Sequence, residues 1–169
     1  MEKILIVTNE FYPFKGGIGR YCEELITETA KDFDVTLVAP KYDGSFSKTT
    51  LAKQITVNYL DGGQFKYWHL PGLIKKILSI DFSSYDHVLV ADWPFWIAIE
   101  IVNKYIPWKK KIKFSLMLHG SEILNLKNGR ASIFPKFLDI FDGVENIYTN
   151  SNYTKEILYK CHNVPSSIP

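Results

Sequence analysis

Short apolar runs alternate along the chain with segments in which apolar residues recur at helical spacing. The runs are typical of buried parallel strands, and the recurring pattern is typical of amphipathic helices. We predict strands at 3–8, 34–39, 55–60, 87–91, 113–118 and 146–149. We predict helices at 18–29, 68–80, 94–106, 131–141 and 152–161, the last with Ser151 or Asn152 as its N-cap.

This alternation predicts an α/β fold, in which helices cover both faces of a parallel sheet. Right-handed crossovers favour a doubly wound, Rossmann-like order with the first and fourth strands at the centre. In such a sheet the loops that follow the strands meet at one edge, where ligands bind. We expect Pro40 to end the second strand, a polar loop at 41–50, a turn at Gly62-Gly63 and another loop at 119–129.

A glycine-rich segment, Gly16-Gly17-Ile18-Gly19, lies between the first strand and the first helix. Glycines there let a ligand approach the backbone amides closely, and a helix N-terminus favours anions. The segment fits a dinucleotide-binding motif poorly, because Cys22 stands where the third glycine should be. We predict a site for a phosphate or a polyhydroxylated ligand, and the alternative is an ordinary turn that starts a helix.

Two later strands also end in polar residues. His119 and Glu122 follow the fifth strand, where they can bind hydroxyl groups or exchange protons with them. The alternative is a loop histidine and an acid near a helix cap. Asp92 and Trp93 follow the fourth strand, and a carboxylate beside an indole suits a sugar. The alternative is an N-cap aspartate and a tryptophan in the core.

Composition excludes several classes of protein. The net charge of +2 is too small to indicate nucleic-acid binding. The two cysteines, Cys22 and Cys161, lack metal-ligand spacing and are interpreted as free thiols in a reducing cytoplasm. No apolar run approaches the roughly 20 residues of a membrane-spanning helix, and the opening residues lack a signal-peptide pattern.

Several segments in order resemble the family 4 glycosyltransferases, the large retaining group with the GT-B fold. The opening strand, Phe11-Tyr12-Pro13 and the glycine-rich segment through Tyr21 are similar to that family's N-terminal signature. Asp92-Trp93 matches its acidic position after the fourth strand, and 119–122 resembles its fifth-strand motif. Residues 149–154 resemble the segment that enters its last N-terminal helix, so the resemblance covers essentially the whole chain.

The resemblance implies an enzyme with two doubly wound domains that face a cleft. Such a hexosyltransferase-type enzyme moves a sugar from a UDP- or GDP-sugar to an acceptor hydroxyl and retains the anomeric configuration. By this resemblance, residues 1–162 are the N-terminal, acceptor-side domain and 163–169 begin an interdomain linker. The C-terminal donor domain is absent from this chain, so we expect the fragment alone to be inactive.

The resemblance also assigns residues. It places His119 beside the donor sugar as the catalytic residue, and it places Gly16 and Gly17 at the donor diphosphate. It implies neither a metal nor a cofactor, because backbone amides and cations meet the diphosphate. Candidates for acceptor or sugar binding are Arg20, Asp92, Trp93 and Glu122.

The implied partners are a nucleotide sugar, a sugar or lipid-linked acceptor of polysaccharide or glycolipid biosynthesis, and the donor domain. We expect a cytoplasmic protein with no nucleic-acid partner. Residues 108–113, with Lys75-Lys76, indicate either peripheral contact with anionic lipids at the inner face of the membrane or a solvated lysine turn. Two other functions stay open: a non-catalytic or partner subunit that needs a separate donor-domain chain, and another GT-B enzyme such as a sugar-nucleotide epimerase.

Overall fold

The computed structural model describes residues 1–11, 16–41, 55–61 and 65–169. Within these ranges six parallel strands form one sheet in the order β3-β2-β1-β4-β5-β6. This order confirms the predicted doubly wound, Rossmann-like fold with the first and fourth strands at the centre. The strands are β1 (Lys3–Val7), β2 (Asp34–Lys41), β3 (Ile55–Asp61), β4 (His87–Val90), β5 (Phe114–Leu118) and β6 (Val144–Thr149).

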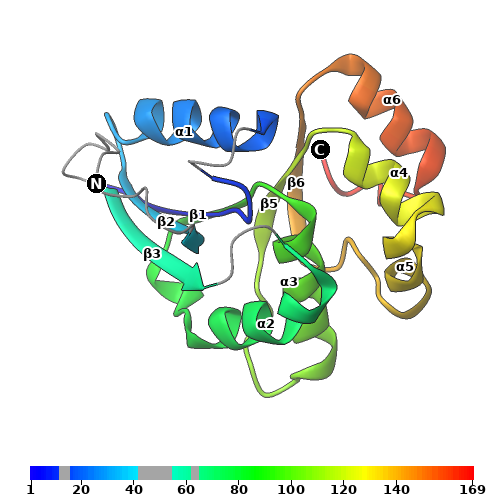
Figure 1. Cartoon of the computed structure of the whole chain (residues 1–169), viewed down its shortest axis with the longest axis horizontal. Helices are drawn as coiled ribbons and strands as arrows, with labels where there is room; N and C mark the ends of the chain where they lie inside the picture. The colour runs from blue at the N-terminus through cyan, green and yellow to red at the C-terminus, as the bar shows by residue number, and fades with distance from the viewer. Residues whose placement is uncertain (12–15, 42–54, 62–64) are drawn as a thin grey trace.

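Helices lie on both faces of the sheet. Figure 1 shows α1 on one side and α2 and α3 on the other, whereas α4, α5 and α6 gather beside β5 and β6. Short 3-10 turns occupy Tyr67–His69, Phe82–Ser84 and Arg130–Ile133. The helices are α1 (Gly17–Thr29), α2 (Leu70–Ser79), α3 (Trp93–Tyr105), α4 (Ser121–Asn128), α5 (Phe134–Phe137) and α6 (Asn152–Cys161).

Two hydrophobic cores follow from this layering. Alternate residues of β1 point to opposite faces, so Ile6 packs with Cys22 and Ile26 of α1 while Leu5 and Val7 join the larger core under α2 and α3. Because both faces are covered, β1 needs a continuous apolar run, as the sequence shows. The central helix α3 is buried along most of its length, which explains its lack of a polar stripe.

Three details of the prediction are wrong: the end of the second strand, the helix at 131–141 and the loop at 119–129. The second strand continues through Pro40 to Lys41, because the fixed φ of proline is compatible with an extended backbone. The helix predicted at 131–141 is only a 3-10 turn followed by the short α5, and α4 forms inside the predicted loop 119–129. The backbone is extended at Leu138, which ends α5 and leads Leu138 and Phe141 into the core.

The other predicted elements are confirmed to within a few residues, and Ser151 is the N-cap of α6, where its hydroxyl accepts from the Thr154 amide at 3.1 Å. The predicted turn at Gly62-Gly63, Tyr12-Pro13 of the family signature and residues 42–50 of the polar loop lie outside the described residues. In the tail at 163–169, Ile168 packs into the larger core. No helix in the described ranges is long and apolar enough to cross a membrane.

Candidate functional site

The loops after β1, β4 and β5 meet at the carboxyl edge of the sheet. Val7 is in register with Val90, and Val90 with Leu116, so the three strands end close together. Residues 8–10, 91–92 and 119–122 therefore form one polar cluster around the start of α1. We call this cluster the carboxyl-edge site.

Asp92 is buried at the centre of this site. Its Oδ2 accepts a hydrogen bond from the backbone N–H of Asn9 and lies 3.1 Å from the Thr8 hydroxyl. Burial raises the pKa of Asp92 to about 7, although the hydrogen bonds from Asn9 and Thr8 oppose that shift. Asp92 occupies the N-cap position of α3 but makes no side-chain cap. The carboxyl group thus fastens the loop after β1 to the end of β4.

His119 is half-buried beside Asp92, with its ring held by the backbone. Its Nε2 lies 3.1 Å from the carbonyl oxygen of Ala91. Because a carbonyl only accepts, Nε2 carries the proton and Nδ1 is the acceptor of the neutral ring. Burial lowers the pKa of His119, and the charge of Glu122 opposes this. The ring of Tyr21 approaches edge-on with centroids 5.3 Å apart.

Glu122 holds the backbone at His119. The Glu122 side chain is 4% exposed, and its carboxylate accepts from the backbone N–H of His119. Gly120 between them has φ of 120°, a conformation that favours glycine and that turns the chain from β5 into α4. Asn150, directly after β6, donates its side-chain amide to the His119 carbonyl at 3.2 Å. His119 is therefore positioned by both its neighbouring elements.

Sequence reasoning missed two residues of the site. Glu10 is half-buried after β1, and burial followed by the charge of Glu122 raises its pKa. Tyr21 lies on the first turns of α1, facing His119 and with its hydroxyl 3.8 Å from Met117 Sδ. The position of Glu10 directly after a buried strand was a signal that could have identified it. Tyr21 ends the segment that resembles the family signature, but its contact with His119 depends on how α1 packs.

The glycine-rich segment forms the start of α1. Gly16 is the N-cap residue with an extended backbone, and Gly17 begins the helix. Among the residues that the structure describes, a Cβ at Gly17 would meet no heavy atom within 4 Å. Amides at a helix N-terminus can bind an anion.

Two predicted site residues lie apart from the cluster. Arg20 points away on α1, where its exposed guanidinium pairs with Glu24 at 3.2 Å. Trp93 is half-buried and packs against Phe65 and Tyr67, with ring centroids 5.1 and 5.9 Å away. The structure thus brings together His119, Asp92 and Glu122, sets Trp93 in an aromatic group next to Asp92, and leaves Arg20 on the surface.

The arrangement can bind hydroxyl groups and an anion. His119 offers a lone pair at Nδ1, Glu10 offers a half-buried carboxyl group, and α1 offers backbone amides. The described ranges hold no group of three His, Cys, Asp or Glu side chains placed to hold a metal ion.

A protein of known structure has a fold similar to that of this chain. The chain's fold is similar to that of HepE from Anabaena, whose crystal structure holds UDP and glucose, with a TM-score of 0.63 and 16% identity. The similarity covers 100% of this chain and 44% of HepE, so the chain spans less than half of that protein. At this identity the likeness shows a shared fold alone. No curated protein matches the chain significantly.

The sequence itself decides the family. The family model described as Glycosyltransferase Family 4 matches residues 15–168, which include the N-terminus of α1, residues 91–92 and 119–122 of the carboxyl-edge site, and α6. The chain belongs to glycosyltransferase family 4.

Proposed function

We propose that this chain is the acceptor-side domain of a retaining glycosyltransferase, which moves a hexosyl group from a nucleotide sugar to an acceptor hydroxyl. The observation that supports this most directly is the carboxyl-edge site itself. Loops from three adjacent strands bring a neutral histidine, a half-buried carboxyl group and the N-terminus of α1 to one edge. Membership of glycosyltransferase family 4 supports a role for this edge in sugar transfer.

The donor is a UDP- or GDP-sugar. Its diphosphate meets the amides at Gly16 and Gly17, because the N-terminus of α1 carries a partial positive charge. HepE, which shares the fold, was crystallised with UDP and glucose, and this supports a nucleotide-sugar donor for the present chain.

His119 lies beside the transferred sugar and accepts a hydrogen bond from a sugar hydroxyl at Nδ1, since Nε2 is engaged by Ala91. Asp92 and Glu122 act through the backbone. Asp92 holds the loop after β1, and Glu122 holds the main chain of His119. The aromatic group of Trp93, Phe65 and Tyr67 offers flat apolar surface to the acceptor.

A second, donor-binding domain completes the site. This chain spans 44% of the length of HepE, and helix N-termini and cations that offset a leaving diphosphate would come largely from the other part. Residues 163–169 then lead towards that domain. We propose a cytoplasmic enzyme that needs both domains for turnover.

The test is a transferase assay on the full-length enzyme with a panel of UDP- and GDP-sugars. We expect transfer from one of them, and an NMR spectrum of the product in which the anomeric configuration of the donor is kept. An inverted product would contradict the retaining mechanism. Absence of transfer from every nucleotide sugar, with a folded protein, would contradict the transferase assignment.

The matched control is residues 1–169 alone in the same assay. We expect a folded domain, judged by a cooperative thermal transition, without sugar transfer. Robust turnover by this chain alone would overturn the role given to a second domain.

A further inference from the structure

The junction between β6 and α6 holds the main chain at the end of β5. The backbone N–H of Asn150 donates to the Leu118 carbonyl at 3.2 Å, and the Asn150 side-chain amide donates to the His119 carbonyl at 3.2 Å. Asn150 thus binds two successive carbonyl groups. Because Glu122 already accepts from the His119 N–H, both backbone polar groups of His119 have partners on neighbouring elements.

The orientation of the Asn150 amide is set by Thr154, in the first turn of α6. Thr154 is 3% exposed, and its hydroxyl lies 2.7 Å from Asn150 Oδ1. Since the His119 carbonyl only accepts, the nitrogen of the Asn150 amide faces it and the amide oxygen faces Thr154. Thr154 therefore donates its hydroxyl proton to Asn150. If the amide turned over, two oxygens would face each other at His119.

A second hydroxyl gives this chain of hydrogen bonds one direction. Ser151 Oγ lies 3.0 Å from Thr154 Oγ1 and accepts from the Thr154 backbone N–H at 3.1 Å. Because the Thr154 hydroxyl proton is directed at Asn150, the Ser151 hydroxyl donates to Thr154 Oγ1. Each group is then a defined donor or acceptor, and hydrogen bonds arranged in this way strengthen one another.

The helix α6 also contacts the segment that leads from β5 into α4. A Cβ placed at Gly120 would lie 3.5 Å from Thr154 Oγ1, so the Thr154 hydroxyl lies against the turn after His119. At the other end of α6, Nε2 of His162 lies 3.0 Å from the Ile123 carbonyl oxygen of α4. Both ends of α6 are therefore fastened to the segment that carries His119.

We propose that Thr154, acting through Asn150, is a positioning residue for His119. This rests on the proposed function, in which His119 lies beside the transferred sugar. The hydrogen bond from Asn150 reaches the His119 main chain, whereas the Ala91 carbonyl holds the ring. A shift of the main chain moves the ring, and a misplacement of about 1 Å near reacting atoms can lower a rate on the order of a hundredfold. The alternative is that these residues only stabilise the start of α6.

The first measurement is an NMR titration of the His119 ring in residues 1–169, which needs no sugar transfer. Burial lowers the pKa of His119, so a ring that is held less firmly and hydrated more should titrate closer to its ordinary value. Thr154→Val and Asn150→Ala should each raise the His119 pKa. Thr154→Ser, which keeps the hydroxyl, should retain the wild-type pKa. An unchanged pKa in both Thr154→Val and Asn150→Ala would overturn the proposal.

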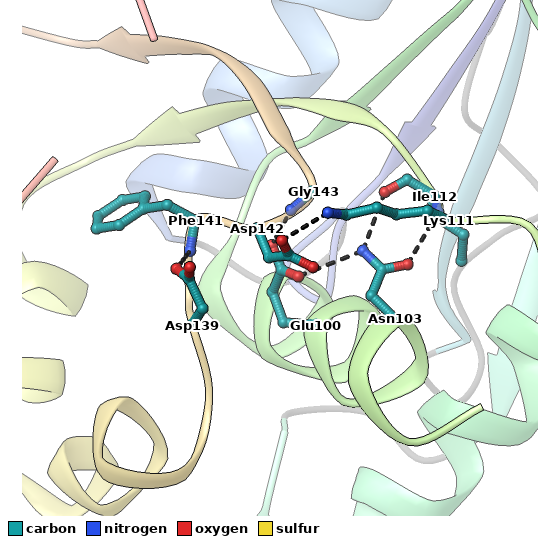
Figure 2. Close-up of polar contacts among 8 residues, drawn as sticks. All are labelled: Glu100, Asn103, Lys111, Ile112, Asp139, Phe141, Asp142 and Gly143. Carbon is teal, nitrogen blue, oxygen red and sulfur yellow. Dashed lines mark hydrogen bonds and ion pairs between the residues drawn. The ribbon is translucent and has the colours of Figure 1, made fainter. Parts of the chain in front are cut away.

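Two control variants separate positioning from stability. Ser151→Ala removes the N-cap of α6 but keeps the donation from Thr154 to Asn150. Asn103→Ala removes a similar bond at the amino end of β5, where Asn103 Nδ2 donates to the Ile112 carbonyl at 3.0 Å (Figure 2). Both controls should lower the melting temperature and leave the His119 pKa unchanged. A rise of that pKa in either control equal to that in Thr154→Val would overturn the proposal.

The second measurement is turnover of the full-length enzyme. Asn150→Ala and Thr154→Val should each lower kcat roughly three- to tenfold, the loss that corresponds to one hydrogen bond. Because Thr154 acts through Asn150, the double variant should lose no more than Asn150→Ala alone. Additive losses, or normal kcat in both single variants, would overturn the proposal. If the wild type transferred no sugar, the proposed function would fail, whereas the titration would still decide whether Thr154 positions His119.

Discussion

The two edges of the sheet use the same device to present different surfaces. At the carboxyl edge, buried Asp92 accepts a hydrogen bond from the backbone N–H of Asn9, and buried Glu122 accepts one from the backbone N–H of His119. At the amino edge, where β5 begins, buried Glu100 accepts a hydrogen bond from the backbone N–H of Gly143. The first edge presents a half-buried histidine, and the second presents an exposed tryptophan among lysines. Buried acids in this protein therefore position loops, and the groups available to ligands are their neighbours.

The prediction with the largest expected effect concerns the protonation of the buried acids at the two edges, Asp92 and Glu100. Burial raises the pKa of both Asp92 and Glu100 to about 7, from the ordinary values of 3.8 and 4.5 for these side chains. A raised pKa favours the protonated form in the folded state. The contribution of these two groups to the free energy of unfolding should therefore be greatest below pH 4 and fall as the pH rises towards about 7, by up to roughly 3 to 4 kcal/mol for each group.

Urea unfolding between pH 4 and 8 measures this profile. Asp92→Asn and Glu100→Gln should each flatten it, because neither amide has a proton to lose. Glu156→Gln, on an exposed glutamate paired with Lys160, is the control and should leave the profile unchanged. A wild-type stability that does not fall over this range would show that the two acids ionise at ordinary pH.

The next prediction distinguishes a catalytic role of His119 at the carboxyl edge from a structural one. His119→Ala should lower turnover of the full-length enzyme about a hundredfold, because a group beside the reacting atoms is removed. His119 is only half-buried, so the melting temperature should change little. His87→Ala, an exposed histidine at the amino edge, is the matched control and should keep normal turnover. A destabilised His119→Ala protein with normal turnover per folded molecule would make His119 structural.

A smaller effect is expected at the helix N-terminus. Gly17→Val should lower turnover at least roughly tenfold by blocking the diphosphate from the amides of α1. The substitution should be tolerated by the fold, since a Cβ at Gly17 meets no heavy atom of the described residues within 4 Å. Gly72→Val on α2 is the control, because that glycine is equally open. Equal turnover in both variants would exclude Gly17 from the phosphate site.

The smallest expected signal is ligand binding by residues 1–169 alone. This chain offers a nucleotide sugar few contacts: the amides at Gly16 and Gly17 and the ring of His119. These contacts must offset the translational and rotational entropy that the ligand loses on binding. We expect an affinity for UDP- or GDP-sugars no better than about millimolar by calorimetry. Micromolar binding would show that this chain holds a complete donor site.

The sequence pattern predicted the strands well because a parallel sheet covered on both faces demands continuous apolar runs. It failed between 119 and 141, where helical spacing at 131–141 favoured a long helix. There the backbone leaves the helix at Leu138, and the side chains of Leu138 and Phe141 pack into the core. Before this segment, α4 starts after Gly120, which has a positive φ. Such a choice depends on packing partners, which local periodicity does not encode.

For this protein the sequence by itself determined the α/β class, the meeting of polar strand ends at the carboxyl edge and the glycine-rich start of α1. Only the tertiary structure decided which polar groups meet there. Asp92 turned inward onto the Asn9 amide, 83 residues away, Tyr21 joined His119, and Arg20 turned to the surface. Periodicity reports which residues are buried, whereas contacts between distant residues depend on strand register and helix packing.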